Sequence, residues 1–423
     1  MIRESSNSIM SEDQLGLAFA DKQTILQNYF KDTSTSFTIK SCKVTTFEEQ
    51  RTGYLGDHHL LTIVINSGDN EEREITVFVK KLPSRIPKLA NCLIELKAFS
   101  KETGLFRELL PRLAEFGRFA PECLFQKGDD LLVFRNVKLD GFKVLDGNRG
   151  LLNLDHLRQV LRALTRLHAA SFALEAQLGK SLVEAFPAVL DENAWPDEEN
   201  HPRVLELENI IGTLCSIIER HEQNASRKEY LLSKIPDCFR QVFELVKSST
   251  VYRNTISHSD LWNNNIMFRL DDSGIPIDCL LVDFQLARYV PPAYDFDMLI
   301  FLTTTRDFRI KNMTSLQDFY YQSLKSELKR HKLDIEQILS QQEFQESCKF
   351  YQRAGAIDSF TINHATLLPR RFLDKAFSSV EQFDRFDQKF KTKLCLETFE
   401  EDPIYRSRIV DIIETLYEAF ELF

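Results

Sequence analysis

A short β-rich segment inside an otherwise helical half of the chain constrains the fold more than any other feature. Residues 255–289 contain two apolar, β-branched runs, NIMFRL and IPIDCLLVDF, separated by the turn sequence DDSG. Such a turn between two apolar runs predicts an antiparallel hairpin. Asp260 and Asn265 then lie in the loop that enters the first strand, and Asp283 lies at the exit of the second. Because antiparallel strands return the chain to its start, we expect these three side chains to meet in space.

The segments on either side of this hairpin differ in their periodicity. The first part of the chain is strand-rich, since TIKSCKVTTF, HLLTIVIN, REITVFVKKLP and DDLLVFRNVKL are enriched in β-branched and aromatic residues. One helical stretch is expected among them, at residues 88–116, and a long amphipathic helix begins at Leu154 and is followed by further helices. We therefore predict an α+β protein with two lobes. A small antiparallel β lobe spans residues 1–137, and a larger, mainly helical lobe spans residues 138–423.

Composition narrows the class of protein and of partner. Hydrophobic residues at 43% and charged residues at 27% are typical of a globular protein that buries a sizeable core. The net charge of -10 argues against broad nucleic-acid binding, which needs a basic face. The N-terminus lacks an apolar core of signal-peptide length and no later run is long enough to span a membrane, so we expect a cytoplasmic protein without membrane insertion. The cysteines form no CxxC or Cys/His cluster, which argues against zinc and disulfides.

The spacing of the hairpin residues favours a magnesium site. Three oxygen-bearing side chains without a Cys/His cluster suit a hard cation better than zinc. An Asp, an Asn five positions later and a subsequent Asp-Phe pair form the phosphoryl-transfer site of protein kinases, and Asp260, Asn265 and Asp283 have this spacing. Taken singly, each aspartate has a simpler interpretation as a turn residue that caps backbone amides. The joint spacing is what favours the metal site.

These motifs resemble those of the insect ecdysteroid kinase-like family. HSDLWNNNIMF and LVDFQLARY are similar to the HGDxWxNNxMF and DFQ motifs of that family, and the similarity extends through FVKKLP, FSKE, the GF pair at 141–142 and LTRLHAASFAL. The family belongs to the kinase-like small-molecule phosphotransferases, which include choline kinases and aminoglycoside phosphotransferases. The resemblance implies a bilobal protein-kinase-like fold. It also implies transfer of the γ-phosphate of ATP, with Mg²⁺, to a hydroxyl group of a small molecule.

The resemblance assigns roles to the three hairpin residues. Asp260 becomes the catalytic aspartate, which accepts a proton from the acceptor hydroxyl or orients it. Asn265 and Asp283 become the magnesium ligands. One carboxylate for the acceptor and two side chains for the metal suit phosphoryl transfer, because this reaction depends mainly on positioning and on neutralising phosphate charge.

The resemblance also places the ATP-phosphate lysine at Lys80, within FVKKLP. A buried lysine in a strand needs an acidic partner. Glu102 in FSKE is the partner that the resemblance implies. Glu95 lies seven residues earlier, on roughly the same helical face, and remains an alternative.

A phosphate-binding loop is expected before the Lys80 strand. The candidate is RTGYLGDHHLL, in which Gly53 and Gly56 allow backbone amides to approach phosphate oxygens. An ordinary hairpin turn explains the same glycines equally well.

Three further residues are expected to have structural roles and no chemical one. His258 resembles the scaffold histidine of the catalytic loop, whose ring orients the backbone around the aspartate. His168 is expected to be a helical packing residue. Asp295 is expected to tie the segment after the metal site to the catalytic loop, by resemblance, or to act as a plain helix N-cap.

Several features leave the acceptor and the activity open. The family suggests an ecdysteroid or another bulky apolar alcohol or xenobiotic, and the 33 phenylalanines suit such a ligand. A choline- or aminoglycoside-type acceptor is an alternative. Ser259 replaces the usual glycine of HGD, and Arg135 stands where the family commonly has an acidic residue, so a ligand-binding pseudokinase is a second alternative. The acceptor pocket is expected among helices that follow Ala170 and Thr303.

Overall fold

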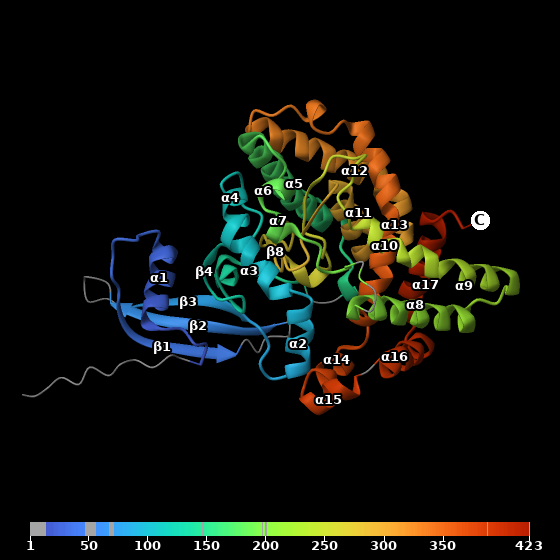
Figure 1. The fold of residues 1–423 in the computed structure, drawn as a ribbon, viewed down its shortest axis with the longest axis horizontal. Coiled ribbons are helices and arrows are strands. Elements are labelled where there is room, and N and C mark those ends of the chain that lie inside the picture. The colour runs from blue at the N-terminus through green and yellow to red at the C-terminus, as the bar shows by residue number, and fades with distance from the viewer. Residues whose placement is uncertain are drawn as a thin grey trace, which may run out of the picture.

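The computed structural model describes residues 14–46, 56–66, 72–145, 148–196, 198, 201–386 and 388–422. Within them the chain forms a β-rich lobe and a larger helical lobe, which lie side by side (Figure 1). This architecture confirms the predicted α+β class, with a small antiparallel sheet followed by a mainly helical part. The exact boundary between residues 137 and 138 stays a prediction.

The β-rich lobe is one five-stranded antiparallel sheet with the strand order β1-β2-β3-β5-β4. Its strands are β1 (Thr38–Thr46), β2 (Asp57–Asn66), β3 (Glu72–Lys81), β4 (Cys123–Lys127) and β5 (Leu131–Arg135). Alternate side chains of β3 point to opposite faces. Val77 and Val79 join the core that includes Ile25 and Leu26 of α1 (Phe19–Phe30). Lys80 therefore points to the opposite face of the sheet.

The predicted helical stretch at 88–116 is helical but broken into three helices. These are α2 (Pro87–Glu95), α3 (Ala98–Glu108) and α4 (Leu110–Ala114). The prediction of one stretch was wrong at two points. Lys97 adopts a left-handed backbone with φ 54°, which ends α2, and Pro111 sits at the start of α4, where its missing N–H costs nothing. The break at Lys97 gives α3 its own direction, and Glu102 on α3 is buried.

The predicted hairpin is present in the helical lobe. It consists of β8 (Ile266–Leu270) and β9 (Pro276–Leu281), which pair antiparallel with Ile266 opposite Leu281. The short strand β6 (Phe142–Lys143) joins β8. A second antiparallel pair, β7 (Thr255–Ser257) with β10 (Arg288–Val290), brackets the hairpin in the sequence. The hairpin and its flanking loops are thus held at both ends.

The remaining elements are helical. The α-helices are α5 (Leu154–Leu178), α6 (Leu182–Ala185), α7 (Pro187–Leu190), α8 (Pro202–His221), α9 (Ala225–Arg240), α10 (Val242–Leu245), α11 (Pro292–Thr303), α12 (Arg306–Arg330), α13 (Gln341–Thr366), α14 (Arg370–Ala376), α15 (Val380–Arg385), α16 (Gln388–Glu401) and α17 (Pro403–Ala419). Among the described residues, the short 3-10 helices are η1 (Val137–Asp140), η2 (Asn148–Gly150), η3 (Asn263–Asn265) and η4 (Ile335–Gln337). Every residue of α11 is buried, so this helix is the centre of the lobe.

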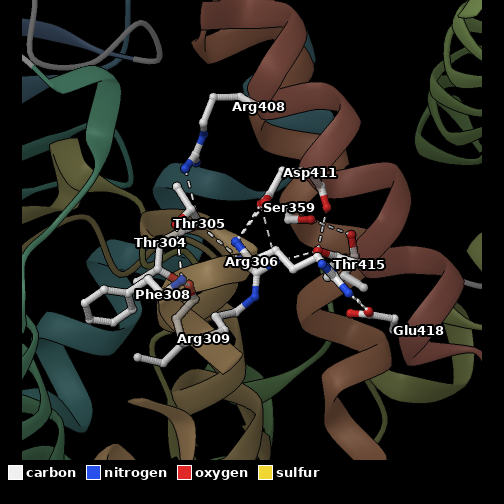
Figure 2. A network of polar contacts seen from close by, with 12 residues as sticks. Thr304, Thr305, Arg306, Phe308, Arg309, Ser359, Arg408, Asp411, Thr415 and Glu418 are labelled. Carbon is white, nitrogen blue, oxygen red and sulfur yellow. Dashed lines mark hydrogen bonds and ion pairs between the residues drawn. The ribbon is translucent and has the colours of Figure 1, made fainter. Parts of the chain in front are cut away.

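Two arginines hold the C-terminal end of α11. Arg408 of α17 donates to the carbonyl oxygens of Leu302 and Thr304 at 3.1 and 3.2 Å. Arg309 of α12 donates to the Thr304 carbonyl at 3.0 Å and pairs with Asp411 of α17 (Figure 2). The last carbonyls of a helix carry partial negative charge, which cations stabilise. The C-terminal helix thereby fixes the central helix in place.

The C-terminal region also returns to the β-rich lobe. Phe377 and Phe383, near α14 and α15, pack against the apolar cluster that includes Leu89 and Leu93 of α2 (Figure 1). The two lobes therefore touch at a second place besides the hairpin region. Among the described residues, no helix combines the length and apolarity needed to cross a bilayer.

Candidate active site

The two ends of the hairpin meet, as the sequence predicts. The backbone N–H of Val282 donates to the carbonyl of Asn265 at 3.0 Å, which places Asp283 beside the entry loop. The Asn265 side chain donates through Nδ2 to the backbone carbonyl of Asp260 at 2.9 Å and to its carboxylate at 2.8 Å. Asp260 and Asn265 are both buried. The structure therefore brings the three predicted residues together, while their roles stay predictions.

Two residues of this site have unusual backbone conformations. Ser259 has φ 62° and Asp283 has φ 70°. A left-handed conformation costs a residue other than glycine roughly 1–2 kcal/mol. The conformation explains why glycine is usual at position 259 in the HGD motif. Strain of this kind persists only where surrounding contacts impose it.

Asp295 supplies the contacts that impose the loop conformation. Its two carboxylate oxygens accept hydrogen bonds from the backbone N–H groups of His258 at 2.7 Å and Ser259 at 2.8 Å. Asp295 lies inside α11, whose N-cap is Pro291. The expected tie to the catalytic loop is therefore confirmed, and the N-cap alternative is wrong.

His258 acts as a scaffold within the loop. Its Nδ1 accepts from the backbone N–H of Asp260 at 3.3 Å, and its Nε2 contacts the carbonyl of Val282 at 2.9 Å. Burial lowers the pKa of His258, so the ring stays neutral and donates through Nε2. The ring also lies 4.6 Å from that of Phe284. These contacts confirm the expectation that His258 orients the backbone around Asp260.

His168 does more than pack. Its Nε2 lies 3.1 Å from Asp295 Oδ2, and its Nδ1 lies 2.6 Å from the Tyr320 hydroxyl. The residue is fully buried on α5. The expectation of simple packing was incomplete, because the ring links α5 and α12 to the carboxylate that holds the catalytic loop. A buried histidine on an apolar helical face is the signal that indicates such a partner.

Lys80 joins the two lobes. Its Nζ lies 2.5 Å from Glu102 Oε2 on α3 and 2.8 Å from Asp283 Oδ1 in the segment that follows β9. The other oxygen of Glu102 accepts from the backbone N–H of Phe284 at 3.2 Å. Glu95 is exposed on α2. The geometry therefore resolves the alternative in favour of Glu102.

The charges of the site shift its pKa values. Burial raises the pKa of Asp260 to about 8, and the neighbouring Asp283 adds to the effect. Burial also raises the pKa of Glu102. Burial lowers the pKa of Lys80, but Asp283 and Glu102 outweigh it and hold the pKa above its ordinary value. Lys80 pairs with the carboxylates of Glu102 and Asp283, while burial and Asp283 disfavour the charged form of Asp260, so further positive charge would stabilise the site.

The residues fit a magnesium ion whose coordination shell is completed by oxygens of the bound substrate. No three His, Cys, Asp or Glu side chains of the described residues gather into a metal site. Mg²⁺ needs only one or two carboxylates when phosphate oxygens and water complete its shell. Asp283 has 23% of its side chain exposed, and Asn265 adds an amide oxygen. Zinc chemistry would require a different set of donors.

The loop before β3 is described only in part. Gly53 lies outside the described residues. At Gly56 a Cβ atom would lie 3.3 Å from His58 Nε2 and 3.6 Å from Lys80 Cε. Gly56 therefore passes close to the Lys80 side chain, and its role toward phosphate stays a prediction.

Arg135, a departure from the family pattern, is held by the β-rich lobe itself. Its guanidinium lies 3.0 Å from Glu122, donates to the Tyr29 carbonyl at 2.8 Å and stacks on the Tyr29 ring at 4.3 Å. Arg135 also lines a cavity of about 570 Å³ together with Phe106 and Phe119. The side chain thus ties β5 to α1.

Comparison with known proteins adds a family. The model of the ecdysteroid kinase-like family matches residues 51–333. No curated protein matches the chain. One solved structure, titled as the microcompartment-associated aminopropanol kinase, is 14% identical, with a TM-score of 0.38 over 90% of this chain and 98% of that one. At such a score the structural likeness supports no argument, and the family match is the informative result.

Proposed function

Because the chain belongs to the ecdysteroid kinase-like family, we propose that it transfers the γ-phosphate of ATP, with magnesium, to a hydroxyl group of a small molecule. The observation that carries this proposal is the meeting of Lys80, Asp283 and the Asp260–Asn265 pair at the junction of the lobes. Lys80 lies far from the other three residues in the sequence. Phosphoryl transfer needs this combination of a phosphate-binding cation, metal ligands and a carboxylate.

In this proposal each side chain has one task. Lys80, held by Glu102, binds the α- and β-phosphate oxygens. Asp283 and Asn265 would hold magnesium, and the ion would supply positive charge that neutralises the phosphate oxygens. Gly56, together with Gly53 in the same sequence motif, is assigned to phosphate binding by the family resemblance.

Asp260 is proposed to act on the hydroxyl group of the acceptor. Its carboxylate orients the acceptor hydroxyl and accepts its proton as the oxygen attacks the γ-phosphorus. The bond between the γ-phosphorus and the β–γ bridging oxygen breaks, and ADP leaves with that oxygen. Because burial and Asp283 hold the pKa of Asp260 near 8, Asp260 must lose its proton before it can act as a base. Positive charge bound near Asp283 favours that loss.

The acceptor we propose is an ecdysteroid or another bulky apolar alcohol. The family match supports this class, and the 33 phenylalanines suit a bulky apolar ligand. We place its pocket among the helices that follow Ala170 and Thr303.

An acceptor panel tests the proposal. Wild type and Asp260→Asn are incubated with Mg-ATP and either neutral hydroxylated steroids and plant-type alcohols or cationic amino alcohols, and products are identified by mass spectrometry. We expect a phosphorylated neutral alcohol that depends on Asp260. A product from the cationic set alone would indicate a choline-type kinase. Nucleotide binding without any Asp260-dependent product would indicate a pseudokinase.

A further inference from the structure

The segment at residues 191–195, DENAW, connects α7 to α8 and contacts both lobes at the active site. None of its residues belongs to the proposed phosphate or metal site. Its position still matters, because it lies between the α2–α3 corner and the loop that follows Asp283. We call residues 191–195 the bridging segment.

Asn193 is the centre of the bridging segment. Its Nδ2 donates to the carbonyl of Leu96, at the end of α2, at 2.9 Å and to the carbonyl of Gln285 at 3.1 Å. Asn193 is 7% exposed, so water competes little for these bonds. One side-chain amide therefore joins a helix of the β-rich lobe to the loop that carries Asp283.

Both sides of this connection lead directly to active-site residues. Leu96 immediately precedes the break at Lys97, after which α3 carries Glu102. On the other side, Gln285 Nε2 donates to Asp283 Oδ2 at 3.4 Å. Gln285 occupies the position where protein kinases have the glycine of DFG. The glutamine thus supplies a contact that glycine lacks.

Neighbouring residues anchor the bridging segment to each lobe. Toward the β-rich lobe, the buried Lys101 of α3 donates to the carbonyl of Asp191. Toward the helical lobe, Glu192 pairs with Arg288 of β10 at 3.0 Å. Glu192 also accepts from the backbone N–H of Trp195 at 2.9 Å, which fixes the turn of the segment. Asn193 is therefore held between two anchored points.

From this geometry we infer that Asn193 is a positioning residue, which sets Glu102 and Asp283 at the spacing that Lys80 requires. It touches neither nucleotide nor acceptor in this account. It acts by fixing the α2–α3 corner against the loop at 283–285. The part of the inference that concerns nucleotide affinity rests on the proposed function. The coupling of the two segments does not, because it can be measured in the protein without nucleotide.

The test compares Asn193→Ala with wild type in two measurements. Hydrogen–deuterium exchange in the protein without nucleotide is expected to be at least tenfold faster for α3 and for residues 283–287, and unchanged for α12. Affinity for Mg-ATP, measured by calorimetry, is expected to fall at least tenfold. Asn193→Ser keeps one hydrogen-bond donor in a smaller side chain, so we expect intermediate exchange rates and affinity. This variant replaces Asn193→Ala in both measurements if the alanine variant does not fold.

Asn363→Ala is the matched control. Asn363 of α13 is also buried, and its side chain donates to the carbonyl of Leu302 at 3.5 Å, within the helical lobe. We expect this variant to lose stability without a change in Mg-ATP affinity or in exchange at α3. If Asn193→Ala leaves exchange at α3 and 283–287 unchanged, the inference is overturned. If wild type fails to bind Mg-ATP, the proposed function fails. The exchange result alone then decides whether Asn193 positions the two segments.

Discussion

At the scale of single residues, the environment of Asp260 disfavours the charged form of its carboxyl group in the absence of ligand. Its pKa rises from an ordinary 3.8 to about 8, first through burial and then through Asp283. The folded protein therefore binds the Asp260 proton more tightly than the unfolded chain does. The contribution of this proton to the free energy of unfolding is largest below pH 3.8, and it is lost as the pH rises toward and through 8.

Asp260→Asn should therefore stabilise the protein. Asparagine keeps the oxygen that accepts from Asn265 but carries no charge at any pH. Without magnesium at pH 8.5, we expect the variant to exceed wild type by at least about 1 kcal/mol in free energy of unfolding. The difference should shrink as the pH falls to about 4. Urea unfolding at several pH values measures this, and a variant less stable than wild type at pH 8.5 would contradict it.

Ser259→Gly should also stabilise the protein. Ser259 adopts φ 62°, and its buried Oγ has no hydrogen-bond partner among the residues that the structure describes. Glycine relieves the left-handed strain and removes the unpaired hydroxyl, so we expect a gain of about 1 kcal/mol in free energy of unfolding. The change leaves Asp260 untouched, so product formation should persist. A loss of stability in urea unfolding would show that Ser259 is not strained.

Single residues also show what the sequence could and could not predict. The spacing of Asp260, Asn265 and Asp283 was enough to predict their meeting, because one hairpin joins them. The choice between Glu102 and Glu95 stayed open, because helical periodicity alone places both on nearly one face. The left-handed turn at Lys97 separates them in space. A positive φ at lysine has no signal in a single sequence.

At the scale of elements, α11 carries the residue that holds the catalytic loop. Asp295 lies near its N-terminal end, and Arg408 and Arg309 hold its C-terminal end. Arg408 is buried, and burial lowers its pKa to about 10. Its bonds to the Leu302 and Thr304 carbonyls replace the water that it has lost.

Arg408→Met should destabilise the protein strongly. Methionine fills similar space but leaves two buried helix carbonyls with fewer donors, at a cost of about 2–4 kcal/mol in free energy of unfolding. Arg330→Met is the matched control, since the Arg330 side chain is 70% exposed and forms an ion pair with Glu327, three residues earlier. We expect the control to change stability by less than about 0.5 kcal/mol. Equal losses in thermal unfolding of the two variants would contradict the role of Arg408.

The elements differ in how well their sequences predicted them. The hairpin and the long helix from Leu154 were predictable, because their turn residues and apolar periodicity are local. The contact of α14 and α15 with α2 was not, because Phe377 and Leu93 are far apart in sequence and carry no pattern that links them. The contacts of Asn193 were unpredictable for the same reason.

At the scale of the whole molecule, Lys80 is an ionic link between the lobes. Its bond to Glu102 lies within one lobe and its bond to Asp283 crosses to the other. A ligand that binds both lobes should take over this link and stabilise the folded protein.

Mg-ADP should therefore raise the melting temperature of wild type. Lys80→Met removes the proposed ligand for the phosphates and leaves Glu102 and Asp283 without the cation that pairs with them. We expect this variant to melt lower than wild type and to lose most of the increase that Mg-ADP produces. Differential scanning calorimetry measures both effects. An increase as large as that of wild type would show that nucleotide binds elsewhere.

The central claim is that Lys80 and Asp283 bind the nucleotide while Asp260 serves the transfer. The most direct measurement follows label from γ-³²P-ATP into an acceptor under single-turnover conditions, together with Mg-ATP affinity, for wild type and Asp260→Asn. We predict similar Mg-ATP affinity for both proteins and transfer by the variant at least about 100-fold slower, in line with the loss of a positioned base. Transfer by Asp260→Asn at the wild-type rate would contradict the account.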